Sequence, residues 1–194
     1  MEKNGGIIVI AAPSGAGKDT VCKYLADKYS NVVIAPSTTT RKRRSDDNQI
    51  GGKVYNFVSE KEFEKMIGQG VFLEHSRFRE NYYGTKIKDI QELIKKDKKV
   101  IMILDVDGGL GIKRMFPESS LIFLKPPSLE ELKERLVSRG SDEPNEIEKR
   151  LKQVDYEYEM SQYFDYVVIN DKLEDTVQEV ANIIFGPNEY SINK

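Results

Sequence analysis

The residues best suited to chemistry form a glycine-rich run near the N-terminus, Ala12-Pro-Ser-Gly-Ala-Gly-Lys-Asp-Thr20. Gly15 and Gly17 allow backbone N–H groups to turn inward on an anion. Lys18 can then reach the β- and γ-phosphates of a nucleotide. This combination is typical of a phosphate-binding P-loop.

The sequence on either side of this run supports that interpretation. An apolar stretch, Ile7–Ala11, precedes it, and a helical pattern with Val21, Leu25 and Tyr29 on one face follows it. A helix that begins at the loop adds partial positive charge at its N-terminus. The alternative is a glycine-rich strand-to-helix turn with a surface lysine, which the strand–loop–helix context disfavours.

Two positions depart from the P-loop pattern G-x-x-x-x-G-K-[ST]. Ala12 replaces the first glycine, and Asp19 follows the lysine, so that the hydroxyl moves to Thr20. Asp19 is either a Mg²⁺ ligand, directly or through water, or an acid that favours the first turn of the helix. The sequence supports both interpretations equally, and Asp19 and Thr20 are the candidate Mg²⁺ ligands.

The composition predicts a soluble globular protein with one substantial core. The chain has 194 residues, which leaves room for small inserted subdomains. Its net charge of −2 argues against nucleic acid as a partner. A single cysteine, Cys22, fits a reducing compartment. Because the chain shows no signal-peptide layout and no membrane-spanning run, we expect a cytoplasmic protein without a membrane partner, either a monomer or a homodimer.

Short apolar stretches alternate with helical patterns along most of the chain. Later helices are expected from Ser128, with Glu131 as its capping-box partner, and around Ile147 and Leu173. This alternation predicts an α/β fold with a P-loop parallel sheet core flanked by helices. The expected strands are Ile7–Ala11, Val32–Ala35, Val100–Leu104, Leu121–Leu124 and Tyr166–Ile169.

The stretch 37–85 interrupts this alternation. It combines polar loops with short aromatic segments such as Tyr55–Val58 and a helix signal that starts at Ser59. We interpret it as an inserted mixed α+β subdomain, which leaves residues 1–36 and 86–194 for the core.

A second basic cluster, Thr39-Thr-Arg-Lys-Arg-Arg44, lies inside this inserted stretch. Arg41 and Arg44 are three residues apart and can grip a phosphate through bidentate hydrogen bonds. Taken alone, such a run is more often only a solvated charged surface.

Several segments together give the cluster a specific context, because they follow one another in the order of motifs found in guanylate kinases. The chain resembles that family over about residues 5–185. The resemblance implies transfer of the γ-phosphoryl group of ATP to GMP, and to dGMP, giving ADP and GDP, with Mg²⁺ as cofactor. The matching segments are residues 37–44, 52–58, 72–75, 81–85, 104–107, 126–128 and 168–171.

The resemblance places the acceptor nucleotide in the inserted subdomain. Glu74 matches the carboxylate that accepts from guanine N1–H and the 2-amino group, and Ser37 and Thr85 match hydroxyls that donate to guanine O6. Because adenine lacks these groups, such a site rejects AMP by roughly 10⁴-fold. The residues that match GMP-binding positions are Ser37, Arg41, Arg44, Tyr55, Glu74, Tyr83, Thr85 and Asp107.

The resemblance also implies a helical lid at about residues 135–155, which closes over the transferring phosphate. The alternative for its arginines is exposed helix charge paired with nearby glutamates. The segment Arg139–Arg150 contains Pro144 and predicts a mobile connection between two helices. The expected catalytic residues are Lys18, Arg135, Arg139 and Arg150, and the expected ATP-binding residues are Ala12, Ser14, Gly15, Ala16, Gly17, Lys18, Asp19, Thr20 and Asn170.

Two stretches depart from the family pattern. Ser45–Gln49 carries two extra residues, and Gly108–Gly111 stands where the family has a glutamine, which predicts a looser turn before the next helix.

Two other functions stay open from the sequence. One is a non-catalytic binding module of the same fold, against which Lys18 and the retained arginines argue. The other is a kinase of a different small phosphate acceptor, against which Glu74, Ser37 and Thr85 argue.

Overall fold

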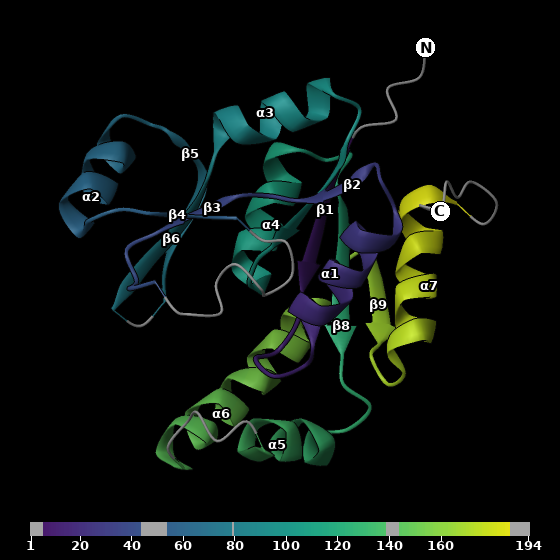
Figure 1. Cartoon of the computed structure of the whole chain (residues 1–194). Coiled ribbons are helices and arrows are strands. Elements are labelled where there is room, and N and C mark those ends of the chain that lie inside the picture. The colour runs from purple at the N-terminus through teal and green to yellow at the C-terminus, as the bar shows by residue number, and fades with distance from the viewer. Residues whose placement is uncertain (1–5, 44–53, 79, 139–143, 187–194) are drawn as a thin grey trace.

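The core of the protein is a parallel sheet, seen in a computed structural model that describes residues 6–43, 54–78, 80–138 and 144–186 (Figure 1). Its strand order is β2-β7-β1-β8-β9, and every neighbouring pair is parallel. The expected strands are confirmed, with ends that differ by at most one residue. Strands β1, β7 and β8 are buried and therefore read as continuous apolar runs, whereas the edge strand β9 is largely exposed. Their bounds are β1 Gly6–Ala11, β2 Val32–Ile34, β7 Lys99–Ile103, β8 Ser120–Lys125 and β9 Tyr166–Ile169.

Helices cover both faces of this sheet. In β1, Ile8 and Ile10 point to the face where α1 (Lys18–Lys28) and α7 (Leu173–Phe185) pack. Ile7 and Val9 point to the opposite face, where α3 (Ile87–Lys95) and α4 (Val106–Met115) pack. This alternation of side chains along one strand builds two hydrophobic layers from a single run of sequence.

Two further helices, α5 and α6, extend from the carboxyl end of the sheet (Figure 1). Helix α5 (Leu129–Ser138) follows β8, and the Ser128 hydroxyl accepts a hydrogen bond from the Glu131 backbone N–H at 3.1 Å, as the capping pattern predicts. Helix α6 spans Pro144–Ser161. The prediction of a mobile connection through Arg150 is therefore wrong from Pro144 onward, because the fixed φ of proline suits the first helical turn. Residues 139–143 lie outside the described part.

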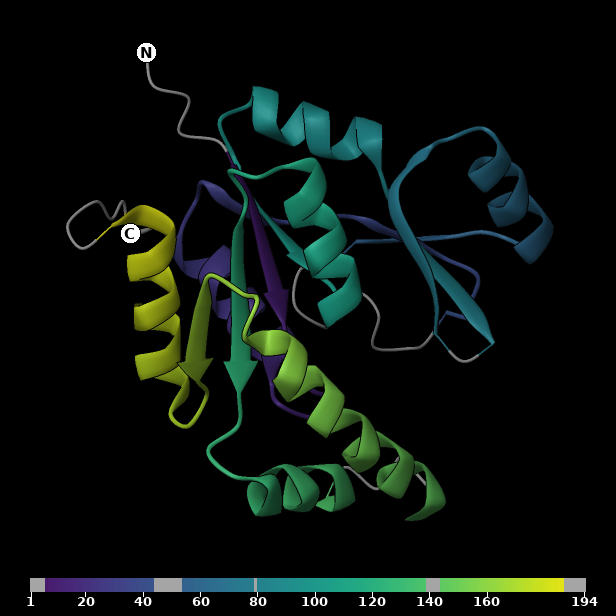
Figure 2. The same ribbon diagram turned by 180° about the vertical axis from the view of Figure 1, so that it is seen from behind.

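A second, mixed sheet lies to one side of the core, together with helix α2 (Glu60–Gly68) (Figure 2). Strands β3 and β4 are parallel, whereas β3–β6 and β5–β6 are antiparallel. Phe63 of α2 stacks on Phe72 and Tyr82, with ring centroids 4.4 and 5.2 Å apart, and this packing anchors the helix to the sheet. The strand order is β4 Tyr55–Phe57, β3 Ser37–Thr39, β6 Asn81–Lys86 and β5 Phe72–Phe78.

The glycines at 108–111 lie within helix α4, and the expectation of a looser turn before that helix is wrong. The Asp105 side chain caps the helix by accepting from the Gly108 backbone N–H at 2.7 Å. At Gly109 an added Cβ would lie 3.1 Å from Val9 Cγ1 and 3.1 Å from Phe164 Cζ. Gly109 therefore lets the helix lie close against β1. The extra residues Ser45–Gln49 lie outside the described part.

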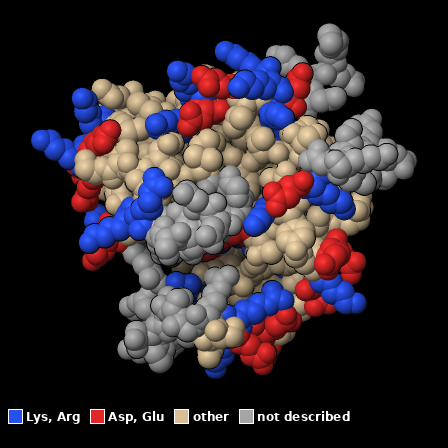
Figure 3. All heavy atoms as spheres, viewed as in Figure 1, with Lys and Arg blue, Asp and Glu red and all other residues tan. Residues whose placement is uncertain are grey.

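The surface carries interspersed charges of both signs on the face drawn in Figure 3. This mixture agrees with the small net charge of −2. Within the described ranges, no helix combines the length and apolar character needed to cross a membrane.

Candidate functional site

The loop between β1 and α1 has the backbone conformation that an anion-binding loop needs. Gly15 and Gly17 have φ values of +93° and +88°, in the left-handed region that side chains other than glycine rarely adopt. Gly17 is the N-cap of α1 and Lys18 is its first residue. The loop therefore ends at a helix N-terminus, where backbone N–H groups and the helix dipole favour negative charge.

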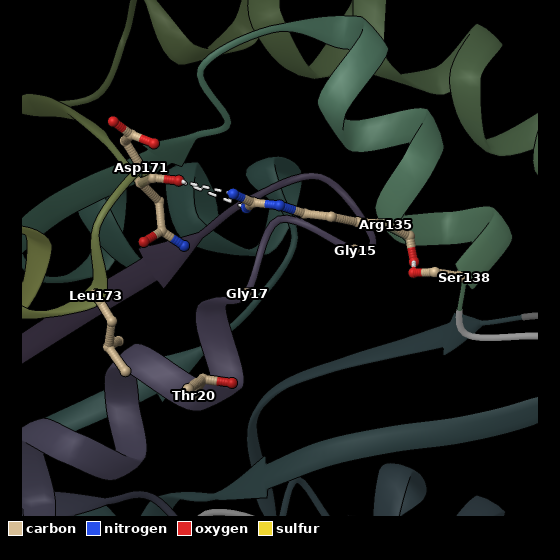
Figure 4. A pocket seen from close by; sticks show the side chains of 8 residues that line it. Gly15, Gly17, Thr20, Arg135, Ser138, Asp171 and Leu173 are labelled. Atoms are coloured by element: carbon tan, nitrogen blue, oxygen red, sulfur yellow. Dashed lines mark hydrogen bonds between the residues drawn. The ribbon is translucent and has the colours of Figure 1, made fainter.

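Asn170, which follows β9, braces this loop from a distant part of the sequence. Its buried side-chain Nδ2 donates to the Ala16 carbonyl oxygen at 2.5 Å. Its own backbone carbonyl accepts from both terminal guanidinium nitrogens of Arg135, each at 3.5 Å (dashed lines in Figure 4). Asn170 thus connects the phosphate-binding loop with helix α5.

A cavity of about 330 Å³ opens beside the loop (Figure 4). Many of its lining residues are predicted from the sequence, whereas Ser138, Asp171 and Leu173 are not. Asp171 belongs to a segment that carried the family resemblance, whereas Leu173 only looked like part of an apolar helix face. The lining consists of Gly15, Gly17, Thr20, Arg135, Ser138, Asn170, Asp171 and Leu173.

The described arginines of α5 and α6 both reach this region. Arg135 forms an ion pair with Glu131 on its own helix, and its guanidinium also lines the cavity. Arg150 of α6 donates to the Ser14 hydroxyl at 2.5 Å and so joins that helix to the loop. Arg139 lies outside the described residues.

The second sheet gathers most of the expected acceptor residues into one row. The strand register pairs Tyr55 with Ser37, and Glu74 with Thr85. Thr38 pairs with Gly84 on antiparallel strands, so the residues one position further along, Ser37 and Thr85, also lie next to each other. Paired residues on neighbouring strands present their side chains to the same face. The Thr85 hydroxyl donates to Glu74 Oε1 at 2.6 Å. Ser37, Tyr55, Glu74 and Thr85 therefore form a polar row across the sheet, which we call the acceptor row.

Two further expected residues lie close to this row. Tyr83 is two positions before Thr85 on β6 and shares its face. The Arg41 guanidinium lies 4.7 Å from the ring centroid of Tyr55 and 5.3 Å from that of Phe57. This cation–π contact places a positive charge at the Tyr55 end of the acceptor row. Arg44 lies outside the described residues.

Asp107 lies in the first turn of α4, where it is exposed. One of its carboxylate oxygens, Oδ1, accepts a hydrogen bond from the Tyr156 hydroxyl of α6 at 2.7 Å. Sequence reasoning missed Tyr156, because no local pattern shows which helix will lie beside Asp107.

Helix α6 also carries a buried carboxyl group that was not predicted from the sequence. Glu157 is 8% exposed. Burial raises the pKa of Glu157 to about 7, the Lys18 ammonium opposes this rise, and Asp105 adds to it. Since Glu157 comes seven residues after Arg150, the helical repeat could have placed both on the face toward the loop.

The candidate metal ligands lie at the start of α1. Asp19 and Thr20 are exposed, Thr20 lines the cavity, and Asp19 is in the first helical turn. Within the described residues there is no group of three or more His, Cys, Asp or Glu arranged for a metal. Mg²⁺ bound mainly through phosphate oxygens and water needs only one or two protein oxygens, so this donor set fits that ion.

Comparison with known proteins resolves the family. A family model described as guanylate kinase matches residues 4–186. This chain belongs to the guanylate kinase family. The guanylate kinase of Caldanaerobacter subterraneus subsp. tengcongensis is 39% identical over 186 residues, covering 96% of this chain and 89% of that protein. The guanylate kinase of Clostridium perfringens ATCC 13124 is 37% identical over 185 residues, covering 95% of this chain and 85% of that protein.

A solved guanylate kinase supports the same assignment in three dimensions. The crystal structure of guanylate kinase from Anaplasma phagocytophilum matches with a TM-score of 0.74 and 31% identity, covering 93% of this chain and 84% of that one. The resemblance inferred from motif order is confirmed, and so is the expected α/β fold of a P-loop guanylate kinase.

Proposed function

We propose that this guanylate kinase transfers the γ-phosphoryl group of ATP to GMP, and to dGMP, giving ADP and GDP. The observation that carries the proposal is the acceptor row, in which Thr85 and Glu74 are already joined by a hydrogen bond of 2.6 Å. A buried hydroxyl beside a carboxylate offers the donor and acceptor pattern that complements a guanine edge.

ATP would bind at the loop that precedes α1. Lys18 would neutralise its β- and γ-phosphates, while the backbone from Ala12 to Gly17 cradles them. The cavity lined by Thr20, Arg135 and Asn170 continues from that loop and would take the rest of the nucleotide. The proposed ATP-binding residues are those expected from the sequence, with Asn170 acting also as a brace on Ala16.

GMP would bind over the second sheet. Glu74 would accept from guanine N1–H and the 2-amino group, with the Ser37 and Thr85 hydroxyls at O6. The Thr85 hydroxyl would turn its one proton from Glu74 Oε1 to O6 when guanine binds. Arg41, stacked on Tyr55, would hold the phosphate together with Arg44 and Tyr83. AMP would leave Glu74 facing a lone pair, which accounts for selection of guanine.

Catalysis in this proposal is positioning and charge stabilisation. The transition state spreads negative charge over the phosphoryl oxygens, so no covalent nucleophile is needed. Arg135 of α5, Arg150 of α6 and Arg139, which lies between them in the sequence, would supply positive charge as these helices close over the bound nucleotides. Closure would also exclude water and so prevent hydrolysis of ATP.

Mg²⁺ fits the oxygen donors at the start of α1, and when bound it would neutralise phosphate charge. If Asp19 is a ligand, Asp19→Ser should raise the Mg²⁺ concentration needed for half-maximal turnover. Asp175→Ser is a matched control, because Asp175 lies in the first turn of α7. If the two variants give the same Mg²⁺ titration as the unchanged protein, Asp19 is only a first-turn acid.

The test of the proposed function is a coupled assay of ADP release with Mg²⁺-ATP against GMP, dGMP, AMP, CMP and UMP. We expect strong turnover with GMP and dGMP and little with the other acceptors. Lys18→Ala should lower kcat by on the order of 10³-fold, because it removes charge from the phosphoryl-transfer site. Tight binding of GMP without turnover of any acceptor would instead support a binding module.

The remaining proposals concern the setting of the enzyme. ATP and GMP are its proposed small-molecule partners, with no nucleic acid or membrane partner. We place it in the cytoplasm, where both nucleotides are available, as a monomer or homodimer. Its single cysteine, Cys22, is buried.

A further inference from the structure

Tyr156 and Asp107 form a hydrogen bond between two helices that are far apart in the sequence. The Tyr156 hydroxyl of α6 donates to Asp107 Oδ1 of α4 at 2.7 Å. The two helices pack against each other, and Figure 2 shows the end of α6 below α4. The bond therefore joins the helix that carries Arg150 to a carboxylate in the proposed GMP site.

This hydrogen bond contributes little to the stability of the fold. Tyr156 is 43% exposed and Asp107 is exposed as well, so water could satisfy both groups. A hydrogen bond between exposed groups adds little to folding. Asp107 also lies in the first turn of α4, where the helix dipole already favours its negative charge.

The geometry of the bond leaves Asp107 able to bind a ligand. A carboxylate has two acceptor oxygens, and Tyr156 occupies only Oδ1. The hydrogen bond to Asp107 is the main cause that raises the pKa of Tyr156. A tyrosine hydroxyl is protonated at neutral pH and can serve as the donor. Tyr156 can thus hold one oxygen of Asp107 while the other faces an acceptor nucleotide.

Helix α6 also contacts the loop that is proposed to bind ATP. Arg150 of α6 donates to the Ser14 hydroxyl of the phosphate-binding loop at 2.5 Å. Arg150 and Tyr156 are six residues apart, or about 9 Å along the helix axis. Helix α6 therefore contacts the phosphate-binding loop through Arg150 and Asp107, in the proposed GMP site, through Tyr156.

We propose that Tyr156 is a positioning residue that orients Asp107 for the acceptor nucleotide, so that helix α6 links the two substrate sites. The inference rests on the proposed placement of Asp107 in the GMP site. A side chain held in one rotamer loses less conformational entropy when the nucleotide binds, so the bond strengthens GMP binding.

The test compares Tyr156→Phe with the unchanged protein in steady-state kinetics and in direct GMP binding by calorimetry. Loss of one hydroxyl should raise the KM and the Kd for GMP about 3- to 10-fold, the range set by a hydrogen bond to a charged group at an exposed site. The KM for ATP should stay within about 2-fold, since no ATP contact is removed. Tyr163→Phe is the matched control, because Tyr163 is 61% exposed and follows the same helix.

Asp107→Asn, Asp107→Ala and the double variant of Asp107→Ala with Tyr156→Phe separate the possible outcomes. If Tyr156 acts through Asp107, Tyr156→Phe should have much less effect on GMP binding once Asp107 is Ala, because alanine removes the acceptor that asparagine would keep. Equal effects in both backgrounds would overturn the inference, as would an equal rise in the KM values for ATP and GMP. If Asp107→Asn weakens GMP binding and Tyr156→Phe does not, the positioning role fails while the proposed site stands. If Asp107→Asn leaves GMP binding unchanged, the placement of Asp107 itself is wrong.

Discussion

Asn170 shows how one side chain can serve the structure of a site rather than its ligand. The family resemblance matched it to an ATP-binding position. In the structure its amide nitrogen is only 2.5 Å from the Ala16 carbonyl oxygen, inside the phosphate-binding loop. An added Cβ at Gly17 would lie 2.8 Å from the same nitrogen. Asn170 therefore helps to define the shape of the loop before any nucleotide arrives.

Asn170→Ala should weaken ATP binding more than GMP binding. The change leaves a carbonyl of the loop without its partner and opens space behind Gly17, so we expect a loss of about 1–2 kcal/mol in the free energy of unfolding. The KM for ATP should rise by about 10-fold, a response measured by varying each substrate in turn.

The control for this change is Asn182→Ala, at an exposed position of α7. It should leave both KM values near those of the unchanged protein. A KM for ATP that does not move in Asn170→Ala would contradict the bracing role.

Helix α4 shows that glycines in one segment can have different roles. Gly109 lies against Val9 and Phe164, with no room for a Cβ unless the core shifts. At Gly111 the nearest atom to an added Cβ is the end of the flexible Arg114 side chain, at 3.9 Å. The glycine run is thus a packing requirement at one position and a loss of helix propensity at another.

The two alanine substitutions should change stability in opposite directions. Gly111→Ala should add about 0.5–1 kcal/mol to the free energy of unfolding, because alanine favours the helix and meets open space. Gly109→Ala should lower it by about 1 kcal/mol or more, because overpacking against β1 outweighs the gain in propensity. Thermal unfolding measures both, with shifts of roughly 2–4 °C per kcal/mol.

Each variant serves as the control for the other, since both make the same chemical change in one helix. A rise in Tm for both would mean that Val9 and Phe164 can move aside at little cost.

The molecule as a whole joins a parallel core to a second sheet (Figure 2), and α6 contacts the phosphate-binding loop through Arg150 and α4 through Tyr156. This arrangement buries Glu157 where α6 faces Lys18 of α1 and Asp105 at the start of α4. Burial disfavours the ionised carboxylate and outweighs the attraction of Lys18, so the pKa is raised from 4.5 to about 7.

Glu157 should make the protein less stable as the pH rises from about 4.5 to about 7. In this range the folded state binds more protons than the unfolded state, so the free energy of unfolding falls with pH. The contribution is complete below the unfolded pKa and is lost as the pH passes the folded one, with a total on the order of 3 kcal/mol. Urea unfolding without nucleotide, at pH 5 and pH 8, measures this change.

Glu157→Gln keeps the size of the side chain and removes the titration. We expect this variant to be more stable than the unchanged protein at pH 8 and about equal to it at pH 5. Glu159→Gln, at an exposed position of the same helix, is the control and should leave the pH dependence unchanged. A full pH dependence in Glu157→Gln would show that other groups carry it.

Features encoded over a few neighbouring residues could be predicted from the sequence. The apolar runs of β1, β7 and β8 predicted buried parallel strands, and Ser128 with Glu131 predicted a capped helix. The phosphate-binding loop was recognisable because its glycines, its lysine and the flanking strand and helix are contiguous. The order of the motifs also predicted the family, since several separate segments had to match it together.

Contacts between distant segments were decided only by the tertiary structure. The helical repeat can place Glu157 on the same face as Arg150, but it does not show that this face meets Lys18. Nothing near Tyr156 in the sequence shows that it reaches Asp107. The same is true of Asn170 and Ala16, which are 154 positions apart in the chain. Hydrophobic periodicity determines which face of a helix is buried, whereas packing against other elements determines what that face meets, and polar contacts depend on the latter.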